Sequence, residues 1–122
     1  MERSGSHRDE FDVKARAMMP LADAARVLSL ELGVREVGTA ERFRAIAKRE
    51  DGLADPCESA AAAYETLMQV RTRQGFRGGA GGRFLDIQEL SSFDRQRLRQ
   101  SFSALDRMQR LLTVRYQTDA IR

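Results

Sequence analysis

The chain has 122 residues, 42% of them hydrophobic and 32% charged, with one His, one Cys and no Trp. This length supports one domain with a single hydrophobic core. One Cys excludes a disulfide framework, and one Cys with one His is too few for a structural zinc site. There is no apolar run of about 18 residues and no secretory signal, so we expect a cytoplasmic protein without a membrane partner.

Arginine dominates the basic residues, with 19 Arg and 2 Lys against 18 acidic residues and a formal net charge of +3. The charge is uneven along the chain. Residues 1–61 hold 10 basic and 12 acidic side chains, and residues 62–122 hold 11 and 6. Such a composition can reflect a GC-rich genome, or it can supply guanidinium groups that bind phosphate or acidic partners. Composition alone leaves both explanations open.

The polar residues 1–10 are expected to be a disordered tail, left over from cloning or from an excised upstream segment. Residues 11–122 are expected to form one helical domain, a C-terminal fragment of a larger protein. Its first helix should begin near Pro20, which fits a first helical turn, and end at Gly33. An apolar face with helical spacing runs through it, and further apolar residues widen that face, so we expect deep burial. These residues are Leu21, Ala25, Leu28 and Leu32, widened by Ala24, Val27 and Leu30.

The second helix should begin at Thr39 as N-cap and run to Asp51-Gly52. The third should begin with Asp55 as cap, Pro56 in the first turn and Glu58 completing a capping box. Four alanines at 60–63 favour close helix packing, and the helix should end near Arg77 before a glycine-rich loop.

A single turn is expected from Asp86 to Leu90, followed by a long helix that starts at Ser91–Asp94, another capping-box pattern. Its apolar face comprises Leu98, Phe102, Leu105, Leu112 and Tyr116, with Met108 and Leu111 beside it. Almost no strand signal is present. The sequence therefore predicts an all-α antiparallel bundle of four helices, or five with the short turn.

The third helix carries two polar residues on its core face. The apolar stripe from Cys57 through Leu67 continues, with the same spacing, to Arg71 and Gln74. A buried guanidinium needs a partner, because leaving it unpaired is costly. Arg71 could pair with an acid such as Asp23, Glu65 or Asp106, or it could line a cleft for an anionic substrate.

Other candidate features favour structural roles. Asp23 and Arg26 are spaced for a salt bridge on an otherwise apolar helix, although either could bind a ligand. Residues 75–83 superficially resemble a phosphate-binding loop, but they follow a helix C-terminus and lack the Walker A ending, so a flexible connection is favoured, although Arg77 and Arg83 could still contact a phosphate. Arg95, Arg97 and Arg99 do not form one basic stripe, so nucleic-acid binding is not expected. His7 lies in the expected tail, and no catalytic constellation is evident. We expect no catalysis by this chain alone.

Several segments between residues 11 and 117 share the order and spacing of a known family. They are Phe11–Lys14, Pro20–Arg26, Thr39 with Arg42, Ala63-Tyr64, Arg71–Gln74, Asp86–Ser91 and Asp94-Arg95. Together they resemble the C-terminal substrate-binding domain that follows a nucleotidyltransferase domain in bacterial signalling proteins. Such proteins usually also carry CBS and cyclic-nucleotide-binding domains, and their transferase part is similar to PII-protein uridylyltransferases. This chain departs from the family at Gln74-Gly75 and in the loop beyond.

The resemblance implies an accessory bundle that positions substrate beside a transferase domain in the same polypeptide. The nucleotide and Mg would belong to that transferase domain, with no cofactor in this chain, and the acceptor could be a nucleotide or a protein. The substrate-facing residues would be Lys14, Arg26, Arg42, Arg71, Arg73 and Gln74. The alternative function is a structural bundle that forms a homodimer through its last helix and couples sensor domains to an output.

Overall fold

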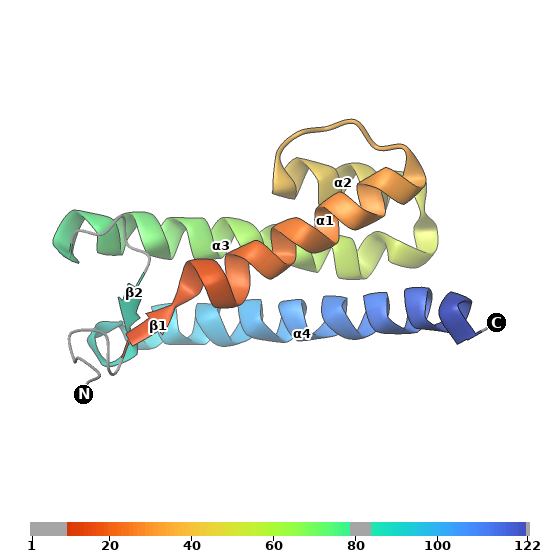
Figure 1. Ribbon diagram of the computed structural model, residues 1–122. Helices are drawn as coiled ribbons and strands as arrows, with labels where there is room; N and C mark the ends of the chain where they lie inside the picture. Colours follow the sequence, from red (N-terminus) through yellow and green to blue (C-terminus); the bar gives the residue numbers. More distant parts are fainter. Residues whose placement is uncertain (1–9, 79–83, 122) are drawn as a thin grey trace.

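Two long antiparallel helices organise the chain, and a third crosses one face of the pair (Figure 1). The computed structural model describes residues 10–78 and 84–121. The long pair is α3 (Ala54–Gly78) and α4 (Ser92–Ile121), and the crossing helix is α1 (Met19–Leu32). The predicted all-α bundle is confirmed. None of the described helices combines the length and the hydropathy that crossing a bilayer requires.

Helix α2 (Thr39–Arg49) packs against both α1 and α3. The N-cap is Gly38, one residue before the predicted Thr39. The helix ends at Arg49, and a turn of 3-10 helix over Asp51–Leu53 leads into α3. Its amphipathic pattern is as predicted, with Phe43, Ile46 and Ala47 buried.

The described residues include a small two-stranded sheet that the sequence did not predict. Strand β1 (Glu10–Asp12) pairs antiparallel with β2 (Phe84–Asp86), and Phe11 lies opposite Leu85. Glu10, the last residue of the expected tail, is thus in a strand. This sheet lies at the end of the bundle where α3 ends and α4 begins (Figure 1). The glycine-rich residues 79–83 lie outside the described residues.

Several helix ends have the expected local chemistry. Gly33 has a φ of 72°, the left-handed conformation that glycine adopts without strain, and ends α1. The Ser91 hydroxyl accepts a hydrogen bond of 3.1 Å from the backbone N–H of Asp94, which caps α4. The predicted turn is a 3-10 segment over Ile87–Glu89, capped by Asp86.

Two further predictions about helices were wrong. Helix α3 begins at Ala54, so Asp55 is not its cap, and the Asp55 carboxylate instead accepts a 2.7 Å hydrogen bond from Arg107. Helix α1 is not buried all round, since Val27 is 39% and Leu30 78% exposed. Its buried side consists of Leu21, Ala24, Ala25, Leu28 and Ser29. A helix lying on the outside of a bundle buries one face and leaves the other in solvent.

A cluster of three side chains ties the end of α1 to α4. Arg115 donates two hydrogen bonds, of 2.9 and 2.8 Å, to the two carboxylate oxygens of Glu31. The Tyr116 hydroxyl donates a further one to the same carboxylate. These donors lower the pKa of Glu31 from 4.5 to about 2.

We predict that Glu31 makes stability pH-dependent in acid. Because its pKa is lowered in the folded state, its contribution is present above pH 4.5 and is lost as the pH falls from 4.5 toward about 2. Glu31→Gln should lower the free energy of unfolding at pH 7 by about 0.5–1 kcal/mol, the range for partly exposed ion pairs. Urea denaturation from pH 7 to pH 2 measures this. The variant and the wild type should converge at pH 2, and Glu89→Gln, the matched charge change, should have no such effect.

Candidate functional site

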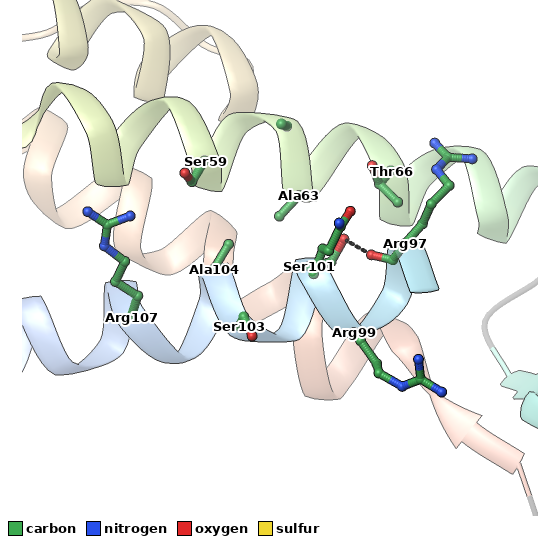
Figure 2. Close-up of a pocket in the computed structure, with 11 residues that line it drawn as sticks. Ser59, Ala63, Thr66, Arg97, Arg99, Ser101, Ser103, Ala104 and Arg107 are labelled. Carbon is green, nitrogen blue, oxygen red and sulfur yellow. Dashed lines mark hydrogen bonds between the residues drawn. The ribbon is translucent and has the colours of Figure 1, made fainter. Parts of the chain in front are cut away.

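An open groove of about 460 Å³ runs between α3 and α4 on the face opposite α1. Figure 2 shows this face, with the ribbon of α1 behind the pair. Helix α3 contributes Ser59, Ala62, Ala63 and Thr66. Helix α4 contributes Arg97, Arg99, Gln100, Ser101, Ser103, Ala104 and Arg107.

Small side chains create this groove. Ala63 of α3 lies across from Ser101 and Ala104 of α4 (Figure 2), so no bulky group fills the space above the helix contact. Ser101 is buried, and its hydroxyl donates a 3.0 Å hydrogen bond to the carbonyl of Arg97. The hydroxyls of Ser59, Thr66 and Ser103 line the groove more openly.

The charged residues that line the groove are all arginines. Arg107 lies at one end and Arg97 and Arg99 at the other (Figure 2). No acidic residue is among the described residues that line it. The arrangement therefore presents positive charge and hydroxyl donors, a combination that suits an anionic ligand.

A second hollow of about 430 Å³ adjoins the groove, because Arg97 lines both. The other residues lining it are Met68, Gln69, Thr72 and Arg73. The two hollows are therefore adjacent, with Arg97 shared between them.

The Asp94 carboxylate contacts Arg73 and Arg97 at the end of the bundle that carries the small sheet. This carboxylate is only 12% exposed and accepts a 3.0 Å hydrogen bond from Arg73 across the helix pair. Arg97 lies 3.6 Å from the same oxygen and also donates to the Gln69 side chain. Asp94 thus positions one arginine from each long helix at the wall of the hollow.

Four of the six predicted substrate-facing residues lie near this end of the bundle. Arg71, Arg73 and Gln74 are in the last turns of α3, and Lys14 begins the short π-helical segment Lys14–Met18 that follows β1. Arg71 and Gln74 are half-buried, which fits their predicted position on the core face. Arg73 lines the second hollow.

The acids predicted as possible partners of Arg71 each pair with another arginine. Asp23 pairs with Arg26, Glu65 with Arg44, and Asp106 with Arg110. The binding role of Arg71 stays a prediction.

The remaining two predicted residues make local contacts elsewhere. Arg26 forms the expected salt bridge with Asp23, 2.9 Å long, on the outer face of α1. Arg42 donates a 2.9 Å hydrogen bond to the carbonyl of Glu36 and so secures the loop before α2. Neither lines the α3–α4 groove.

Sequence reasoning missed the groove arginines Arg97, Arg99 and Arg107. The sequence suggests Arg97 and Arg99 only as part of a possible nucleic-acid-binding stripe. Arg95, the third arginine of that cluster, donates a hydrogen bond to the backbone carbonyl of Leu90. The feature of the sequence that could have indicated the groove is the presence of small residues in both long helices: the four alanines at 60–63 in α3, and Ser101, Ser103 and Ala104 in α4. That signal has meaning only once α3 and α4 are known to be neighbours.

The described residues contain no cluster of three or more His, Cys, Asp or Glu side chains that could hold a metal ion. Cys57 is buried, and burial raises the pKa of its thiol to about 11. It is therefore a core residue and a poor nucleophile.

We predict that Asp94→Asn lowers the free energy of unfolding by about 1–2 kcal/mol, because a mostly buried carboxylate loses a charge-assisted hydrogen bond from Arg73 and an ion pair with Arg97. The control is Asp106→Asn, whose pair with Arg110 is exposed and should cost less than about 0.5 kcal/mol. Chemical denaturation measures both. Equal losses of stability in the two variants would show that Asp94 does not stabilise the end of the bundle that carries the small sheet.

Comparison with protein families gives a match over most of the chain. Searches of curated proteins and of solved structures returned none. Residues 1–116, nearly the whole chain, match the family described as "Putative nucleotidyltransferase substrate binding domain". The family's name associates it with a nucleotidyltransferase, as the resemblance in the sequence implied. The chain belongs to this family.

Proposed function

We propose that this chain is an accessory domain that binds an anionic substrate in the α3–α4 groove and positions it beside a nucleotidyltransferase domain. The substrate would be the acceptor of the transfer, either a nucleotide or another phosphate-bearing molecule, while the nucleotide that is transferred would bind the transferase domain. The observation that carries the proposal is the lining of the groove, where every charged side chain is an arginine. Family membership supports the substrate-binding role.

The contacts of Arg99 and Arg107 are of a kind that a phosphate can replace, whereas Arg97 is held in place by Asp94. Arg107 pairs with Asp55, whose side chain is 80% exposed, and exposed ion pairs contribute little stability. Arg99 has a single weak contact, 3.4 Å, with Gln96 among the described residues. A phosphate offers a guanidinium two parallel hydrogen bonds, so these side chains can turn to a ligand at low energetic cost.

The wider arrangement extends the proposal to the end of the bundle with the small sheet. There Lys14, Arg71, Arg73 and Gln74 would contact the substrate or the transferase domain. Catalysis, nucleotide and Mg would belong to that domain in the same cytoplasmic polypeptide. We also propose a bacterial signalling role, with CBS and cyclic-nucleotide-binding domains as sensors.

Titration of the chain with tripolyphosphate and with ATP tests the groove. We expect backbone amide shifts at Thr66, Ser103 and Ala104 in NMR spectra. Arg99→Gln and Arg107→Gln should each weaken binding about five- to tenfold, because each removes a charge-assisted contact. Arg110→Gln on the same helix removes the same charge outside the groove and should change affinity less than twofold. Equal losses in all three variants, or no shifts in the groove, would contradict the proposal.

Arg71 is tested in the longer polypeptide that contains the transferase domain. Arg71→Ala should retain the fold by circular dichroism and lower nucleotide transfer about tenfold or more, if Arg71 contacts the substrate. Arg110→Ala provides the control for loss of one surface arginine. Unchanged transfer in a folded Arg71→Ala protein would assign Arg71 to a structural role.

A further inference from the structure

The outer face of α1 carries a stripe that the bundle leaves uncovered. Met19, Asp23, Arg26 and Leu30 are spaced by four, three and four residues, so they share one side of the helix, opposite the buried side. Met19 is 49% and Leu30 78% exposed. Two apolar side chains thus flank an ion pair on a solvent-facing helix surface.

This stripe is symmetric about the middle of the helix. When two copies of α1 lie antiparallel about a two-fold axis between residues 24 and 25, Met19 lies opposite the partner's Leu30. In the same register Asp23 lies opposite the partner's Arg26. The flanking positions match as well, since Ala22 lies opposite the partner's Val27. A two-fold interface requires this kind of self-complementary surface.

We infer that α1 is a self-association surface and that its occupant is a second copy of this chain. The charges favour this occupant. Asp23 and Arg26 are 2.9 Å apart within one chain, and their side chains are 64% and 57% exposed. In the antiparallel pair each carboxylate faces the guanidinium of the other chain, so two pairs become a network of four charges. An unrelated partner would have no reason to match the symmetry of apolar and charged positions together.

The size of the surface predicts weak association. Helix α1 has 14 residues, or about 21 Å of length, and its outer face buries much less than the about 1,600 Å² of a standard stable interface. We therefore expect a dissociation constant of about 0.1–1 mM for the isolated chain. The surface is independent of the groove, which lies on the far side of the α3–α4 pair (Figure 2).

Sedimentation of the full chain at concentrations up to about 1 mM tests this inference. The wild type should shift from monomer to dimer. Asp23→Arg alone and Arg26→Asp alone should each weaken dimerisation at least tenfold, because each places like charges opposite one another. The double variant D23R/R26D restores opposite charges and should dimerise within about threefold of the wild type.

A mixture of the two single variants separates contacts between chains from contacts within one chain. One variant has arginine at both positions and the other has aspartate at both, so neither retains an internal pair. The mixture should nevertheless form a heterodimer more readily than either variant forms a homodimer. Absence of such a heterodimer would contradict the proposed register, in which Asp23 lies opposite the partner's Arg26.

Two further variants test the location. Leu30→Glu should abolish dimerisation, whereas Val114→Glu, at an exposed position of α4, should leave it unchanged. The opposite result would place the interface on the last helix and overturn the inference. A wild-type chain that stays monomeric at every concentration would also overturn it. Because all these positions are exposed, circular dichroism should show an unchanged fold in every variant.

Discussion

Close packing against α3 is the constraint on which the rest of the structure depends. Ala60 and Ala61 are fully buried and Ala63 nearly so, and they allow neighbouring helices to approach the α3 backbone closely. Helices α2 and α4 both pack against α3, and α1 crosses the α3–α4 pair (Figure 1). Ala62 and Ala63 of the same four-alanine run line the groove on the far face. Core packing and the candidate site therefore have one origin, the alanine run of α3.

Arginines connect the packed elements at their edges. Arg44 links α2 to α3 through two hydrogen bonds to Glu65, of 2.6 and 2.9 Å, and lowers the pKa of that carboxyl. Arg49 donates to the carbonyls of Leu32 and Gly33 and so satisfies the end of α1. Exposed pairs of this kind contribute little stability each, but together they set the relative positions of the helices. Many of the arginines therefore have a structural role. The groove arginines are a smaller set, which lines a hollow together with hydroxyl side chains.

The candidate site was less predictable than the fold. The position of Arg71 and Gln74 on the core face of α3 followed from spacing alone, and both are half-buried. The groove arginines could not be found this way, because their setting depends on which helices are neighbours. Val27 and Leu30 illustrate the same limit, since they extend an apolar pattern along α1 yet face solvent. Periodicity identifies apolar positions, but a helix whose apolar residues extend around most of its surface does not reveal which side the bundle covers.

By itself the sequence determined the helices, most of their ends and the all-α class, because these follow from local chemistry. Gly33 can adopt a left-handed conformation and Ser91 can cap a helix whatever the rest of the chain does. Only the tertiary structure decided which faces remained open. The α3–α4 groove exists because small residues distant in sequence lie opposite one another, and the outer stripe of α1 exists because the bundle covers just one side of that helix. Both surfaces depend on contacts between helices, which a local pattern does not encode.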